Sequence, residues 1–159
     1  MQARLMGIVL AAIVAVVAAG CGSSSSTEMS KADYEAKIQA NGKAVQDAVA
    51  AISAGFTNIK SVAKQVAAAE VAARKAVDDL DATNPPKDVA ADNDALVVAL
   101  RAIDAQLKKL SQAAKAGDAM AAVAAASALQ SSPEIRAGQA AIKDMQKKGY
   151  AVGVLGNDG

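Results

Sequence analysis

Apolar side chains recur between residues 96 and 114 at alternating intervals of four and three residues. The positions are Leu96, Leu100, Ile103, Leu107, Leu110 and Ala114. Because an α-helix has about 3.6 residues per turn, this spacing places them on one stripe, as in a helix that packs inside a bundle. No segment has a convincing strand pattern. The sequence therefore predicts an all-α fold.

Proline, glycine and hydroxyl residues divide the chain into helices. The prolines of Thr83-Asn84-Pro85-Pro86 lack an amide hydrogen and restrain the residue before them, so a helix must end before this turn. Gly117-Asp118 supplies a C-terminal glycine and then a new N-cap, and Ser30 caps the first helix. The predicted helices span 30–54, 58–81, 87–116 and 118–148. Together they form an up-down-up-down four-helix bundle.

The last predicted helix contains its own break signal. Ser132-Pro133 places a hydroxyl cap and a first-turn proline in its middle, so we expect this helix to be kinked or split at Pro133. Gly149 fits the left-handed position that closes a helix, with Tyr150 beside it, and residues 151–159 are predicted to be a disordered tail. The face expected to point inward comprises Met120, Val123, Ser127, Ile135, Ile142 and Met145.

The N-terminal residues are typical of an export signal. Arg4 precedes an apolar stretch from Leu5 to Ala19, in which Gly7 is the one residue that is not plainly apolar. The stretch is too short and too rich in alanine to indicate a membrane span. It ends beside Cys21, the only cysteine of the chain, which is followed by Gly22 and four serines.

The residues Ala18-Ala19-Gly20-Cys21 resemble the lipobox of bacterial lipoproteins. The resemblance implies that residues 1–20 are a signal peptide, cleaved after a diacylglyceryl group has been attached to the sulfur of Cys21. Two acyl chains are enough for a stable anchor. Residues 21–29 would then be a lipidated, flexible tether that holds the protein at the extracytoplasmic face of the cell membrane. The alternative is an ordinary secretory signal or a buried helix, in either case with a chance cysteine.

Composition excludes several classes of function. The chain has 17 Lys and Arg residues and 16 Asp and Glu residues, and loss of Arg4 with the signal peptide leaves equal numbers. This neutral balance gives no net field that would attract nucleic acid. Histidine is absent, which removes the usual general base and the commonest nitrogen ligand for metals. No nucleophile lies beside a base, so we expect neither an enzyme nor a cofactor.

Six aspartates flank the proline turn and are the candidate metal ligands: Asp78, Asp79, Asp81, Asp88, Asp92 and Asp94. The first three fall at the end of a helix, where the helix dipole opposes negative charge. A hard cation such as Ca²⁺ would offset them, although the spacing of a calcium-binding loop is absent. The alternative is pairing with lysines that the bundle brings to the same end: Lys31, Lys37, Lys143, Lys147 and Lys148.

The opposite end of the bundle and its interior offer weaker candidates. A basic group at that end could meet an anionic wall polymer or an envelope protein, or could be an ordinary solvated face. It comprises Lys60, Lys64, Lys108, Lys109 and Lys115, set against Asp104 and Asp118. Asn41 and Ser127 fall on inward stripes, where we expect a polar side chain to fix the helix register. An Ala-rich face such as Ala121 to Ala126 could support self-association.

A wider resemblance covers nearly the whole chain. The lipobox, the segment from Leu80 to Pro86, Ala116-Gly117-Asp118 and Lys148-Gly149-Tyr150 are similar to those of small bacterial lipoproteins with helical-bundle ectodomains. The resemblance implies the fold and brings no assigned activity. We therefore expect a lipid-anchored helical bundle that acts as a binding or scaffolding module at the cell envelope. The alternative is a lipoprotein that binds a divalent cation through its carboxylates.

Overall fold

The computed structural model describes residues 27–54 and 59–152 of the chain. Within them the helices are α1 (Lys31–Ala54), α2 (Ile59–Asp81), α3 (Ala90–Ala116), α4 (Ala119–Ser131) and α5 (Pro133–Lys147), with a short 3-10 helix, η1 (Lys87–Val89). The predicted all-α four-helix architecture is confirmed, and its fourth helix is divided into α4 and α5.

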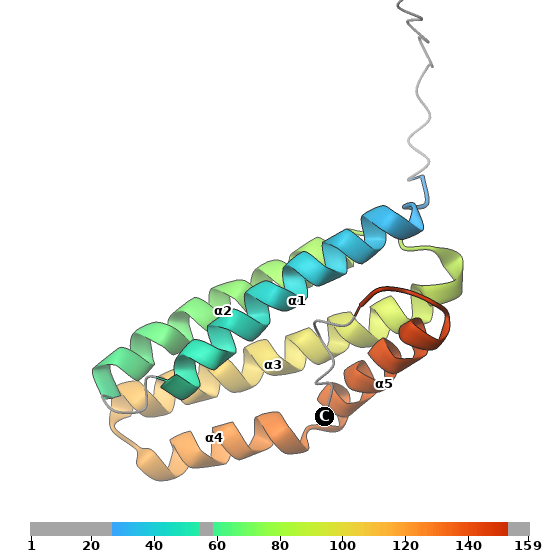
Figure 1. Cartoon of the computed structure of the whole chain (residues 1–159). Helices are drawn as coiled ribbons and strands as arrows, with labels where there is room; N and C mark the ends of the chain where they lie inside the picture. The colour runs from blue at the N-terminus through green and yellow to red at the C-terminus, as the bar shows by residue number, and fades with distance from the viewer. Residues whose placement is uncertain (1–26, 55–58, 153–159) are drawn as a thin grey trace, which may run out of the picture.

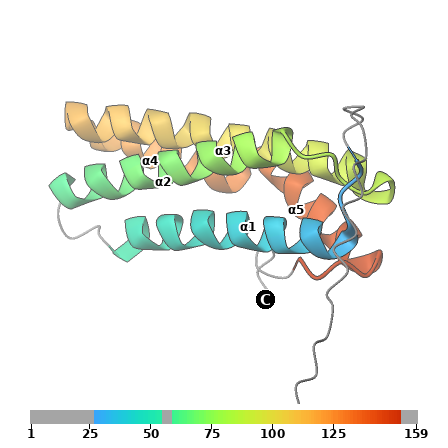
Figure 2. The same cartoon turned by 90° about the horizontal axis from the view of Figure 1, so that it is seen from above.

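Helix α3 lies at the centre of the arrangement. It packs on α2 along one side and on α4 and α5, one after the other, along another, whereas α1 packs mainly on α2 (Figure 1). Figure 2 shows α1 and α2 running side by side along the length of the bundle. The proline turn and the beginning of α1 lie at one end of the molecule, and the α3–α4 turn lies at the other (Figure 1).

The proline turn delays the start of the third helix. The amide of Val89 donates to the carbonyl of Pro86 at 3.0 Å, and Lys87–Val89 forms a 3-10 turn, so α3 begins at Ala90 and not at residue 87 as expected. Gly117 ends α3 with φ 70°. The side chain of Asp118 then caps α4 by accepting from the amide of Ala121 at 2.9 Å.

The break between α4 and α5 lies where the sequence predicts it. Ser132 has ψ 128°, outside the helical range, and its hydroxyl accepts from the amide of Ile135 at 3.4 Å. Pro133 occupies the first turn of α5, where its missing amide hydrogen costs no helical bond. Gly138 then allows α5 to lie close to α3, because a Cβ atom at this position would be 2.5 Å from the Cβ of Ala99.

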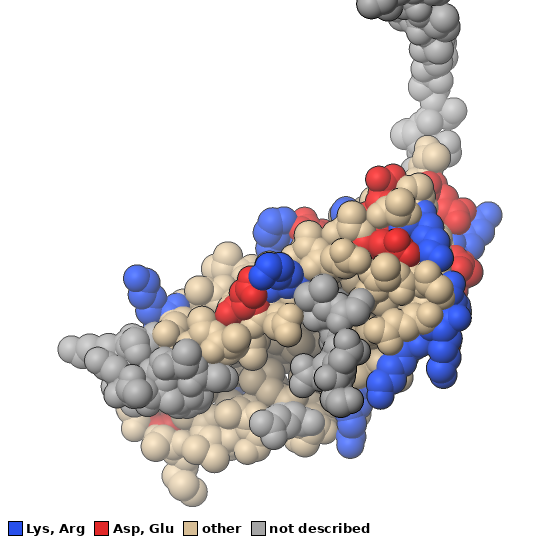
Figure 3. All heavy atoms as spheres, in the orientation of Figure 1, with Lys and Arg blue, Asp and Glu red and all other residues tan. Residues whose placement is uncertain are grey.

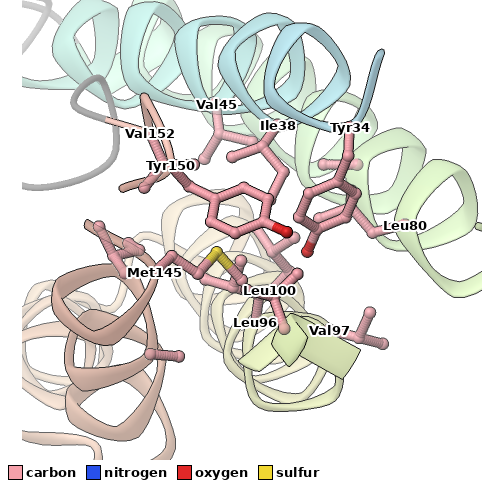
Figure 4. Packing of buried hydrophobic residues seen from close by; sticks show 14 of the residues in the cluster. Tyr34, Ile38, Val45, Leu80, Leu96, Val97, Leu100, Met145, Tyr150 and Val152 are labelled. Atoms are coloured by element: carbon pink, nitrogen blue, oxygen red, sulfur yellow. The ribbon is translucent and has the colours of Figure 1, made fainter. Parts of the chain in front are cut away.

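Two apolar clusters form the core. The cluster nearer the proline turn contains most of the largest buried side chains, including Tyr34, Leu80 and Met145 (Figure 4). The second cluster joins α1, α2, α3 and α4 through Ile52, Val66, Leu107 and Ala125. Both use the stripe predicted for α3: Leu96, Leu100 and Ile103 contact the first, and Ile103, Leu107 and Leu110 the second.

The prediction of which face of α4 points inward is wrong. Met120 is 84% exposed, Val123 is 66% exposed and Ser127 is also exposed. The residues that pack on the second core cluster are Ala122, Ala125 and Leu129. The expectation assumed one register through the whole fourth helix, but the non-helical Ser132 separates the register of α4 from that of α5. On α5, Ile142 and Met145 are buried as predicted.

The C-terminal end of α5 closes as predicted. Gly149 has φ 81°, and the amide of Tyr150 donates to the carbonyl of Met145 at 2.9 Å, the long-range bond of a Schellman motif. The disordered tail was expected to begin at residue 151, which is wrong for two residues. The amide of Ala151 donates to Glu35 at 2.9 Å and Val152 is buried, because this segment turns back onto α1. Residues 153–159 lie outside the described part.

None of the described helices combines the length and the apolar character needed to cross a bilayer.

Candidate functional site

The segment that precedes α1 contacts the bundle at the proline turn. The amide of Met29 donates to the carbonyl of Asn84 at 2.9 Å, and the carboxylate of Glu28 accepts from the amide of Lys87 at 3.0 Å. Cys21, the predicted lipidation site, and residues 1–26 as a whole lie outside the described residues. Any anchor upstream of Thr27 is therefore connected to this end of the bundle.

The six aspartates lie at this same end, and four of them have identified partners. Asp79 pairs with Lys75 at 2.5 Å, and Asp81 with Arg101 at 2.9 Å. Asp88 accepts from the hydroxyl of Tyr150 at 2.8 Å, and Asp92 pairs with Lys148 at 2.7 Å. Asp78 and Asp94 are exposed.

Asp79, Asp81 and Asp92 are thus in three separate ion pairs, and Asp88 is held by a tyrosine hydroxyl. Among the described residues, no group of three Asp, Glu, His or Cys side chains is arranged to hold a metal ion. The lysine alternative is confirmed at Lys148, which also pairs with Asp144 at 2.7 Å. The hydrogen bonds that Lys148 donates to Asp144 and Asp92 raise the pKa of its ammonium group, and the bond that Lys75 donates to Asp79 lowers the pKa of that carboxyl.

The remaining lysines of the expected group act differently. Lys37 donates to the carbonyl of Asp79 at 3.3 Å and to the hydroxyl of Thr83 at 3.0 Å, so it neutralises the C-terminal end of α2 through the backbone. Lys31 lies 4.6 Å from the centre of the Tyr150 ring, a cation–π distance. Lys143 and Lys147 are exposed.

Buried polar groups beneath the aspartates connect three helices. The hydroxyl of Tyr34 donates to Asn93 at 3.1 Å, and the amide of Asn93 donates to the carbonyl of Leu80 at 3.4 Å. Tyr34 and Tyr150 meet edge to face, with ring centres 6.1 Å apart (Figure 4). Burial, with a smaller contribution from Asp92, raises the pKa of Tyr34. Burial and the bond to Asp88 raise the pKa of Tyr150 to about 12.

Sequence reasoning missed Asn93 and the two cationic partners Lys75 and Arg101. Lys75 lies four residues before Asp79, a spacing that by itself indicates a helical ion pair. Asn93 and Arg101 reach across from α3 to α1 and α2, so only the relative position of the helices could identify their partners.

A groove of about 230 Å³ lies between α1 and α5 over α3. Its walls are mainly apolar, with Val45, Val49 and Ile142 among them, and the polar lining residues Asn41, Gln46 and Gln139 carry no charge. Asn41 is buried as predicted, and its amide donates to the carbonyl of Lys37 at 3.1 Å. The volume is below the roughly 300–1,000 Å³ of pockets for drug-sized ligands. We assign no ligand to this groove.

The lysines expected to gather at the opposite end have different surroundings. Lys108 forms an ion pair with Asp104, which also lies 3.6 Å from Arg74. Lys64, Lys109 and Lys115 are exposed, and the side chain of Lys60 lies outside the described part. Asp118 serves as the cap of α4.

Helix α4 presents a surface of different character at this end. None of the residues from Ala119 to Ser131 is charged, and Met120 and Val123 are the two most exposed large apolar side chains on it. Charged side chains gather over the end where α1 begins, whereas the surface over α4 is largely uncharged (Figure 3). A shallow groove of about 540 Å³ lies between α3 and α4.

Comparison of the chain with protein-family models, curated proteins and solved structures gave no match. The function must therefore be inferred from the chemistry and geometry of the chain itself.

Proposed function

We propose that the protein is a lipid-anchored helical module at the extracytoplasmic face of the cell membrane, where it binds a partner through the surface of α4. The anchor is the diacylglyceryl group that the lipobox-like residues before Cys21 imply. In this proposal the tether is shorter than the expected residues 21–29, because Glu28 and Met29 are bonded to the proline turn, and residues 22–26 connect the lipid to the bundle. No catalysis is assigned, since the sequence contains no histidine and shows no nucleophile beside a base.

The observation that carries the proposal is the separation of two features at opposite ends of the bundle. The chain enters beside the proline turn, where aspartates and cations pair with one another. Helix α3 leads away from this end for 27 residues, or about 40 Å at 1.5 Å per residue. The uncharged α4 begins at its far end. A bundle tethered at its charged end would present α4 away from the bilayer.

The anchor is tested by replacing Cys21→Ser in the full chain, expressed in a bacterium that processes lipoproteins. We expect the unaltered protein in the membrane fraction, released by detergent but not by salt, and the variant in the soluble fraction. Ser24→Ala, a change of similar size in the tether, should stay with the membrane. Equal membrane retention of the Cys21→Ser protein would refute the anchor.

A further inference from the structure

Helix α4 exposes large apolar side chains that have no packing role within one copy of the chain. None of the residues of α4 is charged, whereas 21% of the residues of the full chain are charged. Met120 and Val123 are 84% and 66% exposed, and removing such apolar side chains from water is favourable. A contiguous exposed apolar surface of this kind is a feature of interaction sites.

The groove beside α4 has the shape to receive such a surface. Six alanines form most of its walls: Ala113, Ala116, Ala121, Ala124, Ala125 and Ala128. Side chains this small leave room for an incoming side chain between α3 and α4. Met120 is the chain neighbour of Ala121 and lies one helical turn before Ala124, and both alanines line the groove. A flexible methionine can adapt to an irregular gap.

The charges at the groove are arranged so that the groove is complementary to itself. Lys109 lines it from the second half of α3, and Asp118 lines it at the α3–α4 turn, nine residues further along the chain. A two-fold rotation reverses the direction of the groove in the second copy. Lys109 of each copy then meets Asp118 of the other, and the contact is the same in both directions.

We propose that the partner bound by α4 is a second copy of this chain, in an antiparallel two-fold dimer. Each α4 edge, with Met120 as its main apolar side chain, fills the α3–α4 groove of the other copy, and two Lys109–Asp118 ion pairs flank the contact. This inference rests on the proposed function. One helix edge buries less area than the 1,200–2,000 Å² of a standard stable interface, so confinement of the anchored copies to a membrane raises their effective concentration.

Cysteine crosslinking of the full chain in membranes tests the dimer. Ala124→Cys puts a thiol near the expected two-fold axis, and Ala68→Cys puts one on the exposed face of α2 as a matched control. We expect a short bis-maleimide to join Ala124→Cys proteins into a species of twice the mass and to leave Ala68→Cys proteins as monomers. Equal yields for the two variants overturn the dimer.

Charge variants made in the Ala124→Cys protein test the geometry. Lys109→Glu places a carboxylate opposite Asp118 of the other copy at both ends of the dimer contact. The repulsion should lower the crosslinked yield about fivefold or more. Adding Asp118→Asn removes the repulsion, keeps an N-cap side chain, and should restore most of the yield. An unchanged yield with Lys109→Glu, in a protein whose thermal melt is unchanged, overturns the pairing. Separating the same samples into membrane and soluble fractions shows whether the protein is anchored, independently of whether it dimerises. If the protein is found in the soluble fraction, the crosslinking is repeated on that fraction at high protein concentration.

Discussion

Replacing Gly138 by alanine tests the close contact between α5 and α3. A Cβ atom at this position would lie 2.5 Å from the Cβ of Ala99. Carbon atoms in favourable contact are about 3.5–4.0 Å apart. Because the Cβ of Ala99 is fixed to the backbone, no rotamer change relieves the overlap. The two helices must therefore separate by about 1 Å or bend.

Two effects of opposite sign decide the stability of the Gly138→Ala protein. Overpacking a dense core costs about 1–3 kcal/mol. Alanine in a helix is favoured over glycine by about 1 kcal/mol. We expect the first effect to prevail and the free energy of unfolding to fall by about 1 kcal/mol, within a range of roughly 0–2 kcal/mol.

Urea unfolding followed by circular dichroism measures these changes. Ala137→Gly, at the exposed neighbouring position, reports helix propensity alone and should cost about 1 kcal/mol. Combining Gly138→Ala with Ala99→Gly moves the methyl group to the other helix, so the cycle should show a favourable coupling of about 1–3 kcal/mol. A Gly138→Ala protein more stable than the unaltered one by about 1 kcal/mol would refute the close contact.

Three further predictions concern the buried tyrosines and the α5 cap. Tyr34→Phe removes the hydroxyl that donates to Asn93 and should lower the free energy of unfolding by about 1–3 kcal/mol in urea; no change would contradict a buried hydrogen bond. Folding raises the pKa of Tyr150 from 10.0 to about 12. The contribution of Tyr150 to the free energy of unfolding should therefore be complete below about pH 10 and decline as the pH rises toward 12. Thermal melts across this range should show a smaller decline for Tyr150→Phe, and an equal decline argues against this origin. Ser132→Ala should cost about 1 kcal/mol through loss of the cap, against less than about 0.5 kcal/mol for Ser131→Ala; similar costs would exclude the cap.

The helix ends could be predicted from the sequence because their signals are local. A proline without an amide hydrogen, or a glycine at positive φ, acts on residues within one turn, as at Pro86, Gly117 and Pro133. The stripe of α3 was equally clear, since leucine and isoleucine contrast with the polar residues between them.

The orientation of α4 could not be predicted in the same way. Alanine occupies positions on all sides of this helix, so apolar periodicity gives little contrast between its faces. The larger Met120 and Val123 were expected inside, whereas Ala125 packs in the core. The inward face depends on how α4 meets α3 after the Gly117 turn and before the Ser132 break, which is a tertiary property.

The contacts at the proline-turn end are likewise of two kinds, those within one helix and those between helices. Pairing within one helix, as between Lys75 and Asp79, follows from a four-residue spacing. The bond from Tyr34 to Asn93 joins residues 59 positions apart and depends on the relative position of α1 and α3. Calcium binding at this end stays a prediction, and the cations that pair with its aspartates supply the charge balance for which it was invoked.

Mass spectrometry of the natural protein, extracted from its membranes, tests most directly whether a lipid on Cys21 holds the bundle at the cell surface. We predict a mature chain that begins at Cys21 and whose first peptide carries the added mass of a diacylglyceryl group on the sulfur. A chain that still begins at Met1, or a first peptide with a free Cys21 thiol, would contradict the lipid anchor.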